Sequence, residues 1–172
     1  MLKRDFSDYQ VKEILKNVCV IVDTRENANK HIISYFEKKK IPFIVKKLDY
    51  GDYGLLLKKN DKYGLAEDLV LDYAVERKGS LEELSGNLTK DRTRFEEELW
   101  RGQGKLSIVI ENTTINNITN HKYDTKYNEK SFLASLFTFL HRYSIDYTFT
   151  PKKHAGEIIF ALLYYKLREE LK

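Results

Sequence analysis

Residues 73–80, with the sequence YAVERKGS, decide the fold that we expect for this chain. A short apolar run ends here in a carboxylate, a guanidinium and an ammonium group, and a glycine follows. Side chains alternate between the two faces of a strand, so Glu76 and Lys78 share one face and Arg77 points to the other. The stretch therefore predicts a strand that ends at a charged site.

Predicted strands and helices alternate on both sides of this stretch. Apolar and β-branched runs predict strands at 18–23, 42–48, 50–59 (after a turn), 68–78, 105–111 and 145–150. Helical spacing predicts helices at 29–40, 90–101, 129–143 and 151–171, the last with Thr150 as its N-cap. A further helix is predicted to begin at Ser80, with Glu83 as its capping partner. Because 52–78 has the pattern of an antiparallel hairpin, we expect an α/β fold with a mixed sheet in one domain.

The composition is that of a soluble globular protein with a mild basic bias. The chain has 172 residues, 42% of them hydrophobic and 33% charged, and a net charge of +4. This balance suits a nucleic-acid partner without requiring one. The single cysteine, Cys19, excludes an internal disulfide framework, and we expect it to be buried. No apolar run approaches the roughly 20 residues of a membrane span and no signal peptide opens the chain, so we expect an intracellular, cytoplasmic protein.

Carboxylates near the predicted strand ends suggest a metal-assisted hydrolytic site. Glu76 and Lys78 would place a metal ligand beside a fixed ammonium group, a combination that phosphodiester hydrolysis uses. One carboxylate rarely holds Mg²⁺ alone, and Asp52, in a Gly-Asp turn before a strand, is the expected second ligand. Asp23 ends the first apolar strand, and Glu26 follows three residues later.

Each of these residues also has an ordinary structural explanation. Charged side chains at strand ends are usually solvated, and an aspartate after a glycine is common turn chemistry. Glu83 is explained by capping the helix that Ser80 opens. The polar segment 112–128 is expected to be a loop, with a lid over the substrate as one interpretation of it.

The motifs GDY (51–53), ERK (76–78) and DTRE (23–26) together resemble the nuclease domain of the XPF-type structure-specific endonucleases, a branch of the PD-(D/E)xK nucleases. The resemblance spans about residues 18–165, continues through SLEELSGNLTKDRTRFEEEL, and is to the stand-alone members known from phages and bacteria. It implies a restriction-endonuclease-like mixed β-sheet flanked by helices. It also implies a single nuclease domain over 1–172, with 1–17 as an N-terminal arm or helix and no helix-hairpin-helix module.

The resemblance assigns the metal and catalytic roles to the motif residues. Asp52 and Glu76 would bind Mg²⁺ or Mn²⁺, with the backbone carbonyl of Arg77 as a further ligand. Lys78 would be the catalytic lysine. Asp23 would complete the catalytic and metal-binding set.

The resemblance also assigns supporting roles. Glu26 and Arg25 would support the metal site, and Arg77, Arg92 and Arg94 would contact DNA. Many relatives carry an aspartate shortly after ERK, and here either Glu82 or Glu83 takes its place.

The function expected from these observations is a metal-dependent DNA endonuclease, with branched or flap DNA as one expected substrate. The alternative is a catalytically weak DNA-binding or partner-binding subunit on the same fold. The expected partners are DNA, a second copy of the chain in a homodimer, and an accessory DNA-binding protein.

Overall fold

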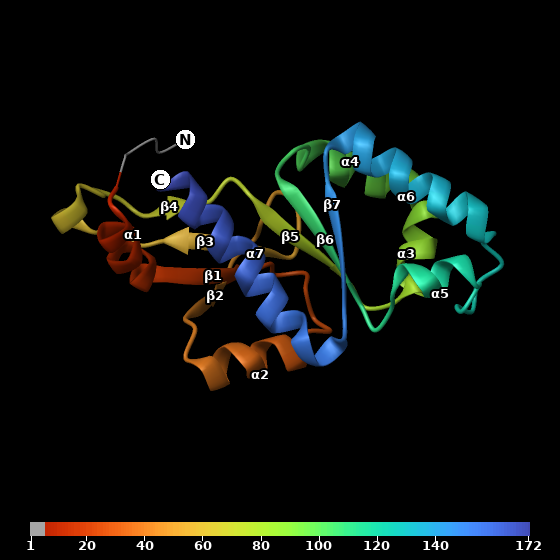
Figure 1. Cartoon of the computed structure of the whole chain (residues 1–172), viewed down its shortest axis with the longest axis horizontal. Coiled ribbons are helices and arrows are strands. Elements are labelled where there is room, and N and C mark those ends of the chain that lie inside the picture. Colours follow the sequence, from red (N-terminus) through yellow and green to blue (C-terminus); the bar gives the residue numbers. More distant parts are fainter. Residues whose placement is uncertain (1–5) are drawn as a thin grey trace.

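The computed structural model describes residues 6–172, and within this range a seven-stranded mixed β-sheet runs through the molecule. The strand order is β2-β1-β3-β5-β6-β7, and β4 pairs with β3 beside this path. Helices cover both faces of the sheet (Figure 1). The predicted α/β fold with a mixed, helix-flanked sheet is therefore confirmed.

The strands divide the sheet into an antiparallel and a parallel part. They are β1 (Val18–Val22), β2 (Phe43–Val45), β3 (Tyr53–Leu57), β4 (Leu69–Val70), β5 (Ala74–Lys78), β6 (Leu106–Glu111) and β7 (Asp146–Thr150). β3 runs antiparallel to β1 and β5, whereas β5, β6 and β7 are parallel to one another. β1, β5 and β6 are buried along their whole length. This burial explains the continuous apolar sequence of β1 and the largely apolar sequence of β6, whereas β5 buries the charged residues Glu76, Arg77 and Lys78.

The single strand predicted over 68–78 is two strands in the structure. Leu56 pairs with Val70, but Tyr53 pairs with Val75 rather than with Tyr73. Two extra residues must therefore fit between the two registers, and the chain bulges between β4 and β5. This two-residue shift in register determines which residues of β5 lie at the end of the sheet.

Two groups of helices cover the two faces. They are α1 (Asp8–Ile14), α2 (Lys30–Lys39), α3 (Leu81–Leu88), α4 (Arg92–Arg101), α5 (Ile115–Thr119), α6 (Glu129–Tyr143) and α7 (Ala155–Glu170), with 3-10 helices η1 (Leu15–Asn17), η2 (Asp61–Tyr63) and η3 (Lys152–His154). Buried side chains of α1, α2 and α7 form one core with the sheet, and those of α3 to α6 form the other. The two groups lie on either side of the sheet in Figure 1.

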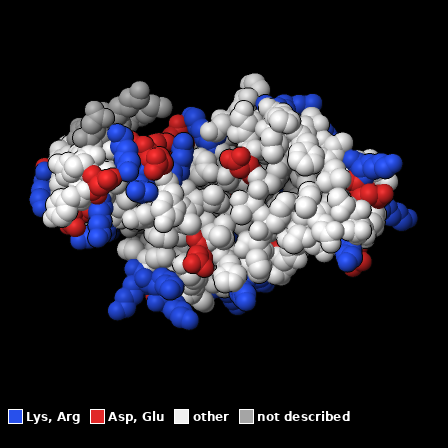
Figure 2. Space-filling view, in the orientation of Figure 1, with Lys and Arg blue, Asp and Glu red and all other residues white. Residues whose placement is uncertain are grey.

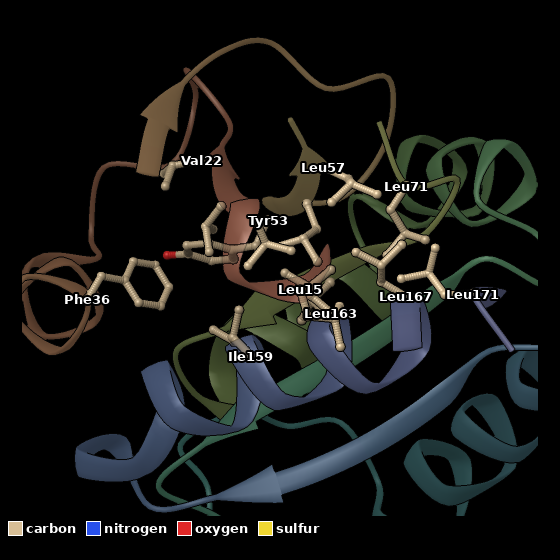
Figure 3. Close-up of a cluster of buried hydrophobic side chains, with 14 of the residues drawn as sticks. Leu15, Val22, Phe36, Tyr53, Leu57, Leu71, Ile159, Leu163, Leu167 and Leu171 are labelled. Atoms are coloured by element: carbon tan, nitrogen blue, oxygen red, sulfur yellow. The ribbon is translucent and has the colours of Figure 1, made fainter. Parts of the chain in front are cut away.

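The first core is built around α7. Ile159, Leu163 and Leu167 follow at intervals of four residues and form one apolar stripe on this helix. Figure 3 shows this stripe turned toward side chains of the sheet and of α2, among them Tyr53, Leu57 and Phe36. The core fixes β1 and β3, and with them the loop ends that carry Asp23 and Asp52.

Three local predictions need correction or restriction. The segment 112–128 contains a short helix, α5, which Thr114 and Asn117 cap reciprocally. Thr150 does not cap the last helix, because it remains paired with Glu111 in the ladder of β6 and β7, and η3 precedes α7. The predicted N-terminal helix is present as α1 and η1, but residues 1–5 lie outside the described residues. Within the described residues no helix combines the length and the apolar character needed to cross a membrane.

Candidate active site

A pocket of about 230 Å³ lies where β5 ends and α3 and α4 begin. Its lining comes from four separate segments of the chain and is formed by Arg25, Asp52, Glu76, Lys78, Glu83, Asn87, Asp91, Arg94, Phe95 and Glu98. The structure thus brings together five of the predicted site residues: Arg25, Asp52, Glu76, Lys78 and Arg94. The other four, Asp23, Glu26, Arg77 and Arg92, do not line the pocket.

A tight turn at Gly51 places Asp52 at the pocket. Gly51 has φ +71°, and a Cβ at this position would lie 2.8 Å from the Cβ of Ala74, so only glycine fits. The backbone N–H of Asp52 then donates to the carbonyl of Val75 (2.9 Å). The Oδ2 atom of Asp52 accepts from the backbone N–H of Arg77 (2.8 Å). Because the N–H and C=O of a strand residue point to the same side, the Arg77 carbonyl is also directed toward Asp52.

Glu76 and Lys78 form a buried pair on the face of β5 that looks into the pocket. Both are only 5% exposed, and the Nζ atom of Lys78 donates to Oε1 of Glu76 (2.6 Å). The ammonium group also lies 4.9 Å from the centre of the Phe95 ring. The second oxygen of Glu76, Oε2, is buried and has no hydrogen-bond partner among the described residues. Such an orphaned carboxylate oxygen is costly in the protein interior unless a ligand satisfies it.

The electrostatics of the pocket favour a bound cation. Burial, and then the charge of Asp52, raise the pKa of Glu76 above its ordinary value. Burial also raises the pKa of Asp52, although the hydrogen bond from the Arg77 N–H opposes this shift. Burial alone would lower the pKa of Lys78, but the Glu76 carboxylate outweighs it, so the pKa is raised and the amine stays protonated. Two carboxylates that resist ionisation side by side are stabilised by a divalent cation.

The donor set fits Mg²⁺ or Mn²⁺ rather than a closed metal cage. The ligand atoms that the pocket offers are oxygens, the orphaned Oε2 of Glu76 and the carboxylate of Asp52. Over residues 6–172, no group of three or more His, Cys, Asp or Glu side chains is arranged to hold a metal ion. Mg²⁺ is commonly held by one or two carboxylates, with water and substrate phosphate as its other ligands. The site therefore has the character of an open oxygen-ligand site.

Asp23 is turned toward its own loop. Its Oδ1 accepts from the backbone N–H (2.9 Å) and Nε (2.6 Å) of Arg25, and its Oδ2 accepts from the N–H of Leu48 (2.6 Å). Burial would raise the pKa of Asp23, but these hydrogen bonds lower it below the ordinary value. The Asp23 backbone N–H donates to the carbonyl of Asp52 (2.8 Å). This geometry favours a role in positioning Arg25 and Asp52, and direct metal binding by Asp23 stays a prediction.

The side chain of Arg77 lies behind the site. Its Nε and Nη2 donate to the two carboxylate oxygens of Glu111 (2.8 and 3.2 Å), and its Nη1 donates to Glu26 (3.2 Å). His31 contacts the same Glu111 carboxylate (2.6 Å). The predicted contact between the Arg77 side chain and DNA does not fit this placement, because the guanidinium is buried and its Nε, Nη1 and Nη2 atoms each already donate to Glu111 or Glu26. Glu26 contacts Arg77 and does not line the pocket, and its supporting role stays a prediction.

The two arginines predicted on α4 have different surroundings. Arg94 is exposed and lines the pocket, as a phosphate contact would require. Arg92 instead donates to Glu96 (2.7 Å) and packs 4.8 Å from the ring centre of Phe139 on α6. Arg92 is thereby turned away from the pocket, and its predicted contact with DNA at this site does not fit the structure.

The structure adds acidic residues that the sequence analysis missed. Asp91 and Glu98 line the pocket with Arg94, and their spacing of three and four residues puts all three on one face of α4. This spacing was the available signal. The Oε1 atom of Glu98 also accepts a long hydrogen bond from the N–H of Gly51 (3.4 Å).

Glu83, rather than Glu82, lies at the pocket. The predicted cap at Ser80 is present, since its hydroxyl accepts from the Glu83 N–H (3.3 Å). The Glu83 carboxylate accepts from the N–H of Gly79 (2.8 Å) and also approaches Lys78 (3.9 Å). Glu82 is directed to the N–H of Asp124 (3.0 Å), away from the pocket.

Comparisons with known proteins give the fold and the family of the chain. Two solved structures are similar over most of this chain: XPF from Aeropyrum pernix (24% identity, TM-score 0.60, 86% of this chain) and the same protein in a complex with DNA (22% identity, TM-score 0.61, 88% of this chain). The matches span 60% and 66% of those longer chains. No curated protein matches the sequence. Residues 22–162 match the model of the ERCC4 domain, and the expected XPF-type nuclease domain is confirmed. The chain belongs to the ERCC4 domain family.

Proposed function

We propose that this chain is a divalent-metal-dependent DNA endonuclease that hydrolyses phosphodiester bonds in the pocket of Asp52, Glu76 and Lys78. One observation carries the proposal: the buried Oε2 of Glu76, which has no hydrogen-bond partner within residues 6–172, lies in a pocket with a second carboxylate and a protonated lysine. Membership of the ERCC4 family, a family of DNA endonucleases, supports the same activity.

Different residues of the chain would have different roles in this reaction. Asp52 and Glu76 would hold Mg²⁺ or Mn²⁺, with the Arg77 carbonyl as a further ligand. When bound, the cation supplies Lewis acidity at the phosphoryl oxygen and lowers the pKa of a bound water. Lys78 is kept protonated by Glu76, so it stabilises negative charge on the phosphate oxygens and does not act as the base. Arg25 and Arg94 are the exposed cations that would contact the flanking phosphates.

The partners that we propose are DNA, a second copy of the chain and an accessory DNA-binding protein. One of the similar structures is a complex with DNA, which supports DNA as the substrate. Figure 2 shows that the face over β7 and the middle of α7 is largely uncharged. Tyr165 on α7 is 57% exposed. This face suits a homodimer contact. Light scattering of the purified protein would show dimers if this is right and monomers at all concentrations if it is wrong.

Cleavage assays test the proposed activity. The substrates are flap, fork, four-way junction, single-stranded and duplex DNA, each with Mg²⁺, Mn²⁺ or EDTA. We expect cleavage to need a divalent cation and to be lost in Asp52→Asn and in Lys78→Met, which keeps the packing over Phe95. Asp146→Asn and Lys152→Ala change exposed residues outside the pocket and serve as matched controls. Equal cleavage by all five proteins would refute the assigned site.

The second candidate is a catalytically weak DNA-binding or partner-binding subunit. The hydrogen bond between Lys78 and Glu76 favours it, because it occupies one oxygen of the proposed ligand (2.6 Å). Calorimetry with Mn²⁺ separates the two candidates. A nuclease takes up Mn²⁺ and loses this uptake in Glu76→Gln, whereas a subunit that has lost catalysis shows no uptake that depends on Glu76.

A further inference from the structure

A second groove adjoins the active pocket and shares Arg25 with it. We call it the Arg101 groove; it has a volume of about 520 Å³ and is lined by Arg25, Lys47, Leu48, Asp49, Tyr50 and Arg101. Three cations face a single carboxylate in this groove, whereas carboxylates outnumber cations in the active pocket. The charge of the Arg101 groove therefore complements a phosphate backbone rather than a metal ion.

Two guanidinium groups of the Arg101 groove are held by adjacent backbone carbonyls. Nη2 of Arg25 donates to the carbonyl of Leu48 (3.3 Å), and Nε of Arg101 donates to the carbonyl of Asp49 (3.1 Å). A guanidinium has five N–H donors, so both groups keep donors for a phosphate. Because these side chains are already positioned, less conformational entropy is lost when they bind a ligand.

The groove leads to an exposed tryptophan. Trp100 precedes Arg101 on α4 and is 67% exposed, the only tryptophan of the chain. Arg101 lines both the Arg101 groove and a further depression that contains Trp100. Arg25 is thus shared by the active pocket and the Arg101 groove, and Arg101 is shared by the groove and the depression at Trp100, which also contains Glu96 and Glu97. Proteins that hold single-stranded DNA use this combination of a basic groove and an aromatic surface for base stacking.

We propose that the Arg101 groove and Trp100 bind an unpaired DNA strand next to the cleaved bond, with phosphates at Arg25, Lys47 and Arg101 and one base stacked on Trp100. The inference rests on the proposed nuclease function and assigns the unpaired strand of an expected branched or flap substrate to a defined site on this chain. A base inside a duplex is covered on both faces by its neighbours, so stacking on the indole needs an unpaired base.

The fluorescence of Trp100 reports directly on this contact, because no other tryptophan contributes. The protein in EDTA is titrated with a short oligothymidylate and, separately, with a blunt duplex that carries the same number of phosphates. Binding is followed in parallel by the anisotropy of a labelled oligonucleotide. We expect saturable quenching by the single strand at the concentrations where the anisotropy rises, and little quenching by the duplex.

Variants separate the base contact from the phosphate contacts. Trp100→Ala should weaken single-strand binding by about 5- to 100-fold, the usual range for one stacked base. Arg101→Ala should weaken binding and reduce the salt dependence of log K by roughly 0.7, the value for one phosphate contact with a single strand. Tyr9→Ala and Lys153→Ala are matched controls, since both residues are exposed and outside the groove. Both should bind as the unchanged protein does.

The results distinguish this inference from the proposed function. Single-strand binding without quenching of Trp100, equal quenching by the duplex, or unchanged affinity in Trp100→Ala would each overturn the inference. Glu76→Gln should keep the quenching and lose cleavage. If quenching is observed but the unchanged protein cleaves no DNA with either metal, the groove stands and the nuclease proposal fails.

Discussion

Removing one negative charge from the active pocket should make the metal-free protein more stable. The perturbation is Asp52→Asn, which keeps an oxygen to accept the hydrogen bond from the Arg77 N–H (2.8 Å). Burial, opposed by this hydrogen bond, raises the pKa of Asp52 to about 7. The folded protein therefore holds an ionised Asp52 at pH 8 only at a cost in free energy, and asparagine removes that cost.

The size of the effect follows from the displacement of this pKa. The ordinary pKa of an aspartate is about 3.9, and a pKa difference of about three between the folded and unfolded states corresponds to roughly 4 kcal/mol. Asp52 is only partly buried, so solvent screens its charge and we halve the figure to about 2 kcal/mol. For a protein of this size, about 2 kcal/mol corresponds to a rise in Tm of roughly 4–8 °C.

The pH dependence gives the sign of the effect. The folded pKa lies above the unfolded one, so at about pH 4 and below Asp52 is protonated in both states and carries little penalty. The penalty grows as the pH rises to about 7 and is fully present above it. The stability gap between Asp52→Asn and the unchanged protein should therefore be larger at pH 8 than at pH 5.

Urea unfolding in EDTA at both pH values measures this gap, with Asp146→Asn as the control for a lost surface charge. Saturating Mn²⁺ should then stabilise the unchanged protein and leave Asp52→Asn nearly unaffected, because only the native site binds the ion. A variant that is less stable than the unchanged protein at pH 8 in EDTA would refute the reasoning. A gap of the same size at both pH values would also refute it.

Three further substitutions test the surroundings of the site. Glu111→Ala leaves the buried Arg77 guanidinium without its main partner and should lower the free energy of unfolding by about 3–5 kcal/mol in urea, whereas Glu111→Gln should lower it less. Gly51→Ala forces a Cβ to within 2.8 Å of Ala74 at φ +71°, so it should cost more than about 1 kcal/mol and weaken Mn²⁺ uptake measured by calorimetry. Asp23→Asn should cost about 1–3 kcal/mol at pH 7; because the folded pKa of Asp23 is lowered, this difference should shrink below about pH 4, where urea unfolding would show it.

The features that the sequence predicted well are local in the chain. The buried strands β1 and β6 follow from largely apolar runs, β5 follows from the short apolar run that ends at Glu76, and the cap of α3 follows from Ser80 and its neighbours. The alternation of side chains along one strand already separates Glu76 and Lys78 from Arg77. The pairing of Asp52 with the end of β5 was accessible because a short antiparallel connection links the two segments.

The features that the sequence analysis missed depend on contacts between distant segments. Glu111 follows Arg77 by more than thirty residues, and its ion pair depends on the parallel register of β5 and β6. Glu98 reaches the pocket because α4 packs across the turn at Gly51. The bulge between β4 and β5 is set by a register that no local pattern encodes. Tertiary packing decides these features, so a single sequence gives little signal for them.

β5 can end in three adjacent charged residues because successive side chains of a strand point to opposite faces of the sheet. Ala74, Glu76 and Lys78 look toward α3 and α4, whereas Val75 and Arg77 look toward the core beneath α7.

Glu111 fixes the Arg77 guanidinium on the face of the sheet beneath α7. This contact helps to hold the backbone N–H of Arg77 in the position from which it donates to Asp52. A slip of one residue would bury the carboxylate and the lysine on the wrong face and expose Arg77 in the pocket. The register of β5 against β6, with Glu76 opposite Ile108 and Arg77 opposite Val109, is therefore as necessary to the proposed chemistry as the acidic residues themselves.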